Sequence, residues 1–396
     1  MVERVVAPRS EGGHTMRLRL IVDGIVLRDY PHAGINRLFN AVLPRLAERA
    51  DTTVELLVPD PCVGALPGGR VRFRARSPFR RTNLSWKLDQ TLETVNRALV
   101  GARVKILPGA VFQSTYFTML PPGWPQVAIA LDFNHELFPE AYETDWGRWL
   151  RGVYPRYLRR ARRIVAISEA TKQHAIRFYG IDAEKIDVVL FGVESEMFFV
   201  DREPETLASL KERFGVRPPY LLYVGGRSAY KNFQRVLDAF ARVADRYDLT
   251  LVVAGEGWSR AERLIIDAFE ARQRLVLIEY PDDDLLRSLY NFATAFVFPS
   301  LWEGFGLPLL EAMACGSPII ASATEVFQEV AGDVPIYFDP YDTDDLARAI
   351  EVAAKGSAPP DLVSRGLDRV RSFSWDRCAE ELHRVYLKAR GGGPRD

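Results

Sequence analysis

Cysteine is scarce in this chain of 396 residues, which contains only three. Cys62, Cys315 and Cys378 lie far apart, without the close spacing of metal ligands, and an odd number cannot pair completely. A disulfide framework and a zinc site are therefore excluded as leading interpretations. Because unpaired cysteines suit a reducing compartment, we expect a cytoplasmic protein. Separately, we expect no bound metal and no cofactor. Peripheral contact with the inner face of the membrane stays an alternative.

Long apolar runs and an excess of charge of one sign are absent as well. No run approaches the roughly 18 to 20 residues that span a bilayer, and arginines interrupt the first apolar stretch, so no signal peptide is indicated. Lys and Arg number 52, as do Asp and Glu, so net charge does not point to nucleic acid as a partner. Residues 1–15 show no periodicity, and we expect either a disordered leader or a true start at Met16.

Arginine is locally concentrated despite the balanced total. Residues 70–81 hold six arginines and no acidic residue, and residues 157–163 hold four arginines. Solvated surfaces explain both stretches. The alternative is contact with an anionic acceptor or a membrane surface.

What the sequence does contain is an alternation of strand-like and helix-like segments in two series. The first series begins with a strand over residues 17–23 and a helix over 35–50. The second begins with a strand over residues 220–224 and a helix over 231–246. Such alternation predicts parallel sheets with helical crossovers, and the length suggests two domains. We therefore predict an α/β fold with two Rossmann-like domains.

A polar stretch over residues 194–204 separates the two series and is the predicted linker. This divides the chain into an N-terminal domain, residues 16–197, and a C-terminal domain, residues 198–374. Residues 375–390 form a final amphipathic helix in this interpretation. No Gly-x-Gly-x-x-Gly follows the first strand of either domain, which argues against a dinucleotide-dependent dehydrogenase.

The most informative segment is residues 299–317, PSLWEGFGLPLLEAMACGS. An apolar strand runs into a glycine-containing loop, and a helix is predicted to begin near Pro308, where a missing N–H costs little. The amides of Gly304 and Gly306 and the helix N-terminus can receive phosphate or sugar oxygens. Glu303 and Glu311 flank this region and can reach one extended ligand.

This segment resembles the donor-sugar motif of the retaining GT-B glycosyltransferases of family 4, also called group 1, which include mannosyltransferases. The resemblance extends from about Met16 to Arg390. It implies two sheets facing across a cleft, a C-terminal helix that crosses back to the N-terminal domain, and no catalytic metal. It also implies that the N-terminal domain binds the acceptor and the C-terminal domain the nucleotide-sugar donor, linked to GDP or UDP.

By the same resemblance, Glu303 lies beside the reacting carbon of the donor sugar, and Glu311 binds the ribose hydroxyls. A carboxylate suits the second task because it accepts two hydrogen bonds. The resemblance places the sugar and diphosphate against the loop residues Gly304, Phe305, Gly306 and Leu307.

A second loop, YVGGRSAYKN at residues 223–232, contains Gly226, Arg227 and Lys231. Two fixed cations would stabilise the negative charge on a departing diphosphate. The dipeptide Glu279–Tyr280 resembles the position where the family's backbone contacts the base. The acidic run over residues 282–284 is predicted to cap a helix rather than to bind a metal.

In the N-terminal half, Gly34 and Arg37 match a family loop that closes on the diphosphate and acceptor. Ser168 is either a helix cap or an acceptor-side residue. The family commonly has His-Asp after the strand over residues 127–131, whereas this chain has Leu131 followed by Asp132. Asp132 remains a candidate catalytic residue.

The missing histidine leaves two interpretations of the donor pocket. Either His135 takes over the role of the family's histidine near the sugar, or the pocket recognises a different face of the sugar. This departure leaves the donor sugar open.

Together these patterns predict a retaining glycosyltransferase that moves a hexose from a nucleotide sugar to a carbohydrate, lipid-linked or other small acceptor. The family resemblance favours GDP-mannose as the donor without deciding between a GDP-linked and a UDP-linked sugar. The alternatives are a sugar phosphorylase or epimerase on the same fold, and a non-catalytic nucleotide-sugar-binding protein. The sequence does not identify the acceptor or the oligomeric state.

Overall fold

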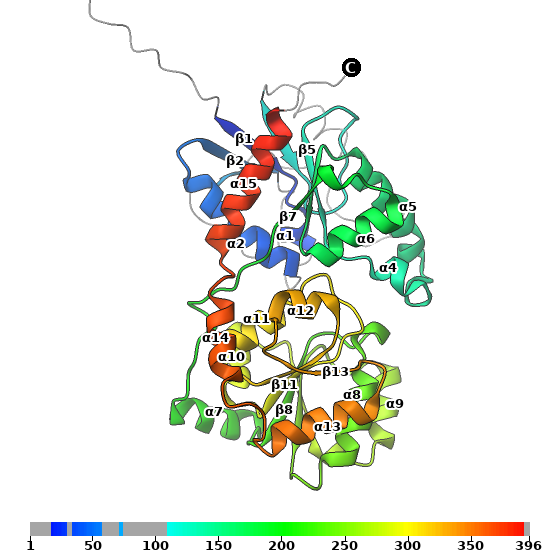
Figure 1. The fold of residues 1–396 in the computed structure, drawn as a ribbon, viewed down its shortest axis with the longest axis vertical. Helices are drawn as coiled ribbons and strands as arrows, with labels where there is room; N and C mark the ends of the chain where they lie inside the picture. The colour runs from blue at the N-terminus through cyan, green and yellow to red at the C-terminus, as the bar shows by residue number, and fades with distance from the viewer. Residues whose placement is uncertain (1–16, 30–33, 58–70, 74–108, 392–396) are drawn as a thin grey trace, which may run out of the picture.

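The computed structural model describes residues 17–29, 34–57, 71–73 and 109–391. The predicted leader over residues 1–15 and most of the arginine-rich stretch over residues 70–81 lie outside these ranges. Figure 1 shows two α/β units, one above the other, joined near the long C-terminal helix.

The N-terminal sheet has seven parallel strands in the order β3-β2-β1-β4-β5-β6-β7. Its strands are β1 (Leu18–Val22), β2 (Thr52–Leu56), β3 (Arg72–Phe73), β4 (Ala110–Gln113), β5 (Gln126–Ala130), β6 (Arg163–Ala166) and β7 (Ile186–Val188). The order reverses between β1 and β4. Strand β1 pairs with β2 on one side and with β4 on the other, where its central Leu20 lies opposite Val54 and Val111. In open parallel sheets, ligands bind beyond the carboxyl ends of strands at such a point.

The helices of this half are α1 (Ile25–Asp29), α2 (Gly34–Glu48), α4 (Asn134–Leu137), α5 (Asp145–Arg160) and α6 (Glu169–Tyr179), with 3-10 turns at Pro139–Tyr142 and Ala183–Lys185. The helix predicted over residues 35–50 is confirmed as α2. Its apolar positions recur every three or four residues and are buried: Leu38, Phe39, Val42, Leu43 and Leu46.

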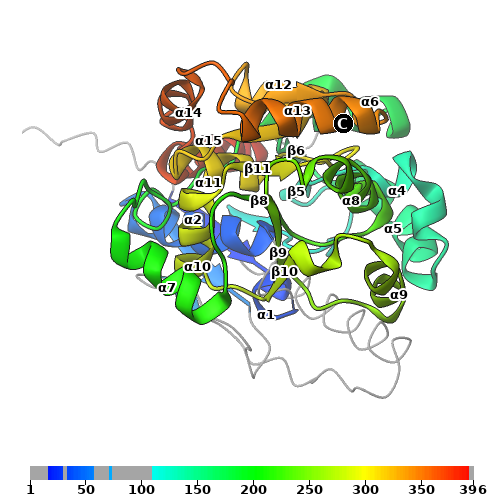
Figure 2. The same cartoon turned by 90° about the horizontal axis from the view of Figure 1, so that it is seen from below.

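The C-terminal sheet has six parallel strands in the order β10-β9-β8-β11-β12-β13. They are β8 (Tyr220–Val224), β9 (Thr250–Gly255), β10 (Leu275–Glu279), β11 (Ala295–Phe298), β12 (Ile319–Ser322) and β13 (Ile336–Phe338). Successive side chains of a strand point to opposite faces, so Tyr220 and Leu222 enter one core and Leu221 and Tyr223 the other. Figure 2 shows this sheet between α10 and α11 on one side and α8 and α9 on the other.

The helices around this sheet are α7 (Pro204–Phe214), α8 (Phe233–Val243), α9 (Arg260–Ala268), α10 (Asp283–Phe292), α11 (Leu307–Ala314), α12 (Glu325–Ala331), α13 (Thr343–Ala354) and α14 (Leu362–Val370), with 3-10 turns at Ala229–Lys231 and Arg272–Arg274. The sequence analysis did not predict α7, α9, α12 or α14. Helix α7 begins at Pro204, the last residue of the predicted linker.

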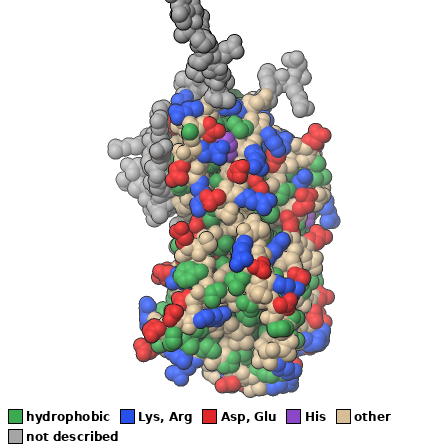
Figure 3. Space-filling model, turned by 60° about the vertical axis from the view of Figure 1, so that its left-hand side comes forward, with side chains coloured by type: hydrophobic (Ala, Val, Ile, Leu, Met, Phe, Trp, Pro, Cys, Tyr) green, Lys and Arg blue, Asp and Glu red, His purple; other side chains and the backbone are tan. Residues whose placement is uncertain are grey.

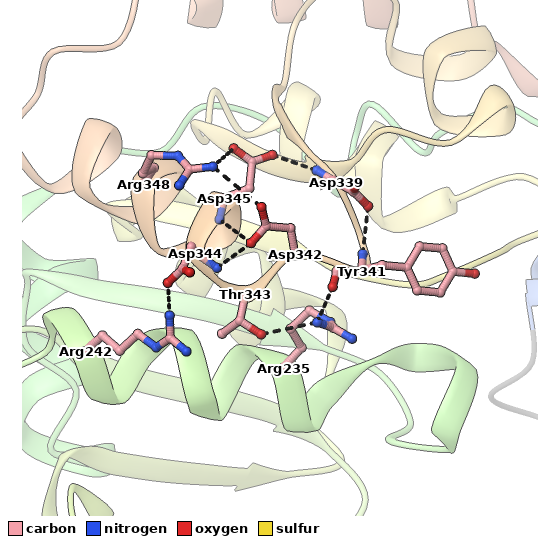
Figure 4. Close-up of polar contacts among 9 residues, drawn as sticks. All are labelled: Arg235, Arg242, Asp339, Tyr341, Asp342, Thr343, Asp344, Asp345 and Arg348. Carbon is pink, nitrogen blue, oxygen red and sulfur yellow. Dashed lines mark hydrogen bonds and ion pairs between the residues drawn. The ribbon is translucent and has the colours of Figure 1, made fainter.

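Acidic residues start two of these helices as caps. Asp282 accepts a hydrogen bond from the Leu285 N–H at 2.8 Å, which confirms the capping prediction for α10. At α13, Asp342 accepts from the N–H groups of Asp344 and Asp345 (Figure 4). Arg235 of α8 donates to the Tyr341 carbonyl at 2.7 Å, so this end of α13 is held to α8.

The final helix α15 (Trp375–Gly391) crosses from the C-terminal unit to the N-terminal sheet, as predicted (Figure 1). It packs on α2 and on strands β1, β4, β5 and β6. Its apolar side is buried, including Leu382, and the Tyr386 hydroxyl donates to Gln113 Oε1 at 3.0 Å. The predicted domain limits at residues 197 and 374 stay predictions, although the last strand of the first sheet and the first strand of the second lie on either side of residue 197.

Basic and acidic side chains are intermingled on the molecular face in Figure 3, in keeping with the balanced total charge. Within the described ranges, no helix combines the length and apolarity needed to cross a membrane.

Candidate active site

The loop after β11, residues 299–306, contacts the N-terminal domain through its backbone. The Gly304 carbonyl accepts hydrogen bonds from Ser168 Oγ at 2.7 Å and Thr171 Oγ1 at 3.2 Å. A Cβ atom at residue 304 would lie 1.7 Å from the Leu131 carbonyl oxygen, so only glycine allows this approach. Ser168 also caps α6, accepting from the Thr171 N–H, and thus joins both units.

Glu303 lies in this loop beside Lys231, whose Nζ is 2.6 Å from Glu303 Oε1. The Ser300 hydroxyl donates to the same oxygen at 2.7 Å. Burial lowers the pKa of Lys231, but the Glu303 carboxylate and the Tyr230 hydroxyl together raise it above its usual value. Lys231 is therefore a fixed cation at this site.

Asp132 follows β5 and approaches this pair from the N-terminal domain. Burial raises the pKa of its carboxyl group, and Glu303 raises it further, while the Asn134 N–H and Lys231 lower it. Glu303 and Lys231 each shift the pKa of Asp132, so the three predicted catalytic residues lie within electrostatic range of one another at the domain interface. Two carboxylates near one ammonium group form a site where a proton or a positive charge can be accommodated.

Asn232 holds the Lys231 loop in place, and the sequence analysis did not identify it. Its backbone is left-handed, with a φ of 58°, a conformation that asparagine tolerates better than most residues. Its side-chain amide donates to the carbonyls of Pro299 at 3.1 Å and Pro340 at 2.9 Å. The loop with Lys231 is thereby tied to the loop with Glu303.

Arg227 lies on the same loop as Lys231 but pairs with a different carboxylate. Its Nε is 2.6 Å from Glu262 Oε1, Nη2 donates to the Gly257 carbonyl at 2.9 Å, and the guanidinium lies over Trp258. The side chain is only 3% exposed. Its Nη1 has no hydrogen-bond partner among the residues that the structure describes.

Two glycines, Gly225 and Gly255, approach each other closely near that unpaired nitrogen. Gly225 has a φ of 118°, and a Cβ atom on Gly255 would lie 2.6 Å from the Gly225 carbonyl and 3.7 Å from Arg227 Nη1. A buried donor without a partner is costly, so an anionic ligand at these glycines would be stabilised by it.

Glu311 lies on α11, buried, with each carboxylate oxygen bound by another side chain. The Tyr290 hydroxyl donates to Oε2 at 3.0 Å, and Arg37 Nη1 to Oε1 at 2.9 Å. Arg37 also pairs with Asp283. Burial raises the pKa of Glu311, while Arg37 and Tyr290 lower it and Asp283 raises it, with a net upward shift. Arg37, expected on the acceptor side, thus contacts the predicted ribose-binding carboxylate.

The other predicted loop residues pack at or near the interface, and their roles in donor binding stay predictions. Phe305 is buried with its ring centroid 5.3 Å from that of Phe191. A Cβ atom on Gly34 would lie 3.2 Å from Leu307 Cδ1, so these residues meet across the interface. Gly306 occupies the N-cap position of α11.

The predicted base-contacting dipeptide is at the end of β10. Tyr280 is 64% exposed, and its N–H donates to the Gly255 carbonyl at 2.8 Å. The Glu279 carboxylate lies against Gly257, 3.0 Å from where a Cβ atom on that glycine would be. Gly226 has open space around it. These three residues border the Arg227 loop, and their roles in binding stay predictions.

His135 is buried in an aromatic cluster of the N-terminal domain. Its Nε2 lies 2.7 Å from the Tyr179 hydroxyl, which donates to Glu136. Burial lowers the pKa of His135 to about 4, so the ring is neutral near pH 7. The structure places this ring against Tyr179 and Tyr154. A contact with a donor sugar stays a prediction.

The sequence analysis did not identify Tyr142 and Tyr230, which lie near the centre of the site. Burial raises the pKa of Tyr142, and Asp132, Tyr230 and Glu303 raise it further, so Tyr142 lies within electrostatic range of Asp132 and Glu303. Tyr230 stacks on Phe138 across the interface, with ring centroids 5.9 Å apart. Isolated loop aromatics have no sequence pattern, and only the fold brings them together.

No group of three or more His, Cys, Asp or Glu side chains able to hold a metal occurs within the described ranges. The acidic run over residues 282–284 acts at the start of α10 instead.

Comparison with known proteins bears on the family and the fold of this chain. Residues 208–361 match the family model described as glycosyl transferases group 1, and residues 34–197 match that of glycosyltransferase family 4. The O-antigen chain mannosyltransferase B of Escherichia coli is 29% identical over 63% of this chain and 66% of its own length. The serotype-specific mannosyltransferase WbdA of the same species is 31% identical over 65% of this chain and 32% of its own length.

These alignments therefore span less than two thirds of either relative. Among solved structures, Anabaena HepE in complex with UDP and glucose superposes with a TM-score of 0.70 at 17% identity, covering 93% of this chain and 98% of that one. The agreement extends over both sheets, and the two family models together match most of the sequence. The chain belongs to the group 1, family 4 glycosyltransferases and has their two-domain GT-B fold.

Proposed function

We propose that this chain is a retaining glycosyltransferase that moves a hexosyl group from a nucleoside diphosphate sugar to an acceptor in polysaccharide or glycoconjugate synthesis. Family membership and the mannosyltransferase relatives support this proposal. Mannose is the first donor sugar to test, linked to GDP or UDP. The nucleotide sugar is a substrate, and no further cofactor is required.

The observation that carries the proposal is the buried Arg227 guanidinium, whose Nη1 lacks a partner within the described ranges and lies near two glycines. A diphosphate oxygen would pair with this nitrogen, and Lys231 would add a second cation. Charge on the leaving diphosphate would then be stabilised by side chains that are already fixed before the reaction. We propose that the C-terminal domain, residues 198–374, binds the donor in this way.

The proposed transfer occurs on one face of the sugar. The bond between the anomeric carbon and the diphosphate oxygen breaks, and its electron pair leaves with the diphosphate. The acceptor hydroxyl oxygen bonds to the same face of that carbon, and its proton passes to the departing diphosphate oxygen. Glu303 and Asp132 would stabilise positive charge on the sugar ring, and Arg227 and Lys231 the leaving group without a metal ion.

We assign the acceptor to the N-terminal domain, residues 16–197 with the helix over 375–390. Loops of that domain supply Asp132, and Ser168 positions the Gly304 loop at the interface. Four arginines at exposed positions follow the outer side of α5: Arg148, Arg156, Arg159 and Arg160. They would suit an anionic or lipid-linked acceptor. They would also suit peripheral contact of a cytoplasmic protein with the anionic inner face of the membrane.

The test measures nucleotide binding to wild-type protein and to Glu311→Ala by calorimetry and thermal shift, with GDP, UDP, ADP and NAD. We expect one sugar nucleotide's diphosphate to stabilise the wild-type protein, with binding reduced about tenfold or more in the variant. Glu380→Ala, an exposed carboxylate on α15, is the matched control. Circular dichroism checks that each variant is folded.

Each other outcome rejects part of the proposal. Binding of NAD alone, or of no nucleotide, would reject the donor site. Once a donor is found, product stereochemistry tests retention, and activity in excess EDTA tests metal independence. Phosphorolysis with inorganic phosphate, or epimerised donor without acceptor, would instead favour a phosphorylase or an epimerase. Donor binding without turnover in any acceptor screen would indicate a non-catalytic binding protein.

A further inference from the structure

Arg37 is the point where the N-terminal domain contacts the predicted ribose-binding residue. It lies in the first turn of α2, and its guanidinium spans two carboxylates of the C-terminal domain. Nη1 is 2.9 Å from Glu311 Oε1, and Nη2 pairs with Asp283. The group also lies 5.5 Å from the centre of the Phe198 ring. A planar fork with two carboxylate partners fixes orientation as well as charge.

Glu311 depends on this contact more than an exposed carboxylate would. Its side chain is 7% exposed, whereas that of Asp283 is 36% exposed and can be stabilised by water. Arg37 is the cation that pairs with Glu311, and Tyr290 supplies a neutral hydrogen bond. A buried carboxylate that loses its cation is destabilised or becomes protonated.

We propose that Arg37 is a positioning residue for the donor nucleotide: it holds the Glu311 carboxylate from across the interface, so nucleotide affinity depends on contact between the two domains. This inference rests on the proposed function. Arg37 itself does not touch the nucleotide in this scheme. Both Glu311 oxygens retain free lone pairs, so ribose hydroxyls bind in addition to Arg37 and Tyr290.

The groups that face Glu311 determine the sign of its pH dependence. They are Arg37 from α2, Asp283 and Tyr290 from α10, and Cys315 at the end of α11. Glu194 in turn lies near Arg37. Without Arg37, burial and Asp283 both favour the neutral acid and only the Tyr290 hydrogen bond opposes them, so the pKa of Glu311 rises further. Nucleotide binding should then weaken as the pH falls.

The experiment is a double-mutant cycle of Arg37→Met and Glu311→Gln, measured by calorimetry with GDP, UDP and ADP at pH 8 and pH 6. We expect Arg37→Met to weaken binding of the nucleotide that the wild type prefers about tenfold at pH 8 and more at pH 6. Protonation of the nucleotide phosphates changes with pH to the same extent for every variant. The ratio of the affinities of variant and wild type at one pH therefore reports on protonation of the protein. In the Glu311→Gln background, Arg37→Met should have no further effect.

Two more variants separate positioning from general damage to the fold. Arg37→Lys retains the charge without the fork and should restore part of the affinity. Asp283→Asn leaves the Arg37–Glu311 contact in place and should bind nucleotide within about threefold of wild type. Equal or tighter binding by Arg37→Met would overturn the inference, as would an equal loss in the Glu311→Gln background, since Arg37 would then contact the nucleotide directly.

A nucleotide-independent measurement separates this inference from the proposed function. If no nucleotide binds wild-type protein, the proposed function fails and so does the role of Arg37 in binding. Thermal unfolding then tests the contact alone. Arg37→Met should lose stability relative to wild type as the pH rises above the pKa of Glu311 in the folded wild-type protein, which burial already raises above its usual value. Above that pH, Glu311 ionises next to Arg37 in wild type but without a cationic partner in the variant. The same substitution in the Glu311→Gln background should show no such trend, and a trend there would overturn the contact as well.

Discussion

Gly304→Ala tests whether close contact between the domains is required for catalysis. The new Cβ atom would lie 1.7 Å from the Leu131 carbonyl oxygen and 3.1 Å from Ile167 Cδ1. The first of these neighbours is backbone at the end of β5 and cannot rotate away as a side chain can. The glycine loop and the N-terminal domain must therefore separate.

The required displacement follows from the contact distance. Real Cβ atoms essentially never approach another heavy atom closer than 3.0 Å, so the separation must increase by at least 1.3 Å, the difference between 3.0 and 1.7 Å. Such a shift lengthens the 2.7 Å hydrogen bond from Ser168 to Gly304 beyond a useful distance and moves Glu303 away from Asp132. A misplacement of about 1 Å can cost about 100-fold in rate.

The assay is the initial rate of donor consumption with an identified donor and acceptor, together with nucleotide affinity. We expect kcat to fall about 100-fold. Nucleotide affinity should fall less, by at most the roughly tenfold expected for loss of the Arg37–Glu311 contact, because Arg227 lies on a different loop. Gly152→Ala on α5 is the matched control, since its Cβ would find its nearest neighbour, Arg156 Nη2, at 3.6 Å. A Gly304→Ala protein with kcat within about threefold of wild type would refute the reasoning.

Two further predictions concern stability. Burial raises the pKa of Glu262, but hydrogen bonds from Arg227 and Ser259 lower it to about 2, so its ionised form stabilises the fold above about pH 4.5. The stability difference between wild type and Glu262→Gln, measured by thermal unfolding, should narrow as the pH falls from 4.5 to 2; a constant difference would contradict this. Leu382→Ala on α15 removes a fully buried side chain and should cost about 2–5 kcal/mol in denaturant unfolding. The exposed Arg384→Ala should cost less than about 1 kcal/mol, and equal losses would contradict the packing assignment.

The two domains contribute different groups to the proposed site. The C-terminal domain supplies the cations Arg227 and Lys231 and the carboxylates Glu303 and Glu311. The N-terminal domain supplies Asp132 and the groups that hold this set, because Ser168 binds the Gly304 carbonyl and Arg37 binds Glu311. Glu329 extends the same interface by accepting from the Glu169 N–H at 2.8 Å.

The sequence by itself determined the architecture, the family and the central loop. Periodicity predicted α2 and α15, because residues that recur at helical spacing must share one buried face. Alternation of strands with helices predicted parallel sheets, because a parallel connection needs a crossover. The combination of strand, glycine loop and flanking carboxylates at residues 299–317 was specific enough to indicate the family, which the comparisons confirm.

Only the tertiary structure decided which side chains meet. Arg37 and Glu311 are 274 residues apart, and nothing local to either specifies the other. The position of His135 against Tyr179, the two carbonyl contacts of Asn232 and the proximity of Tyr142 to Asp132 are decided in the same way. Patterns in the local sequence indicate which residues share one face of a helix or strand. Contacts between domains depend on how the surfaces of the two domains fit together, and a single sequence carries no local signal of that fit.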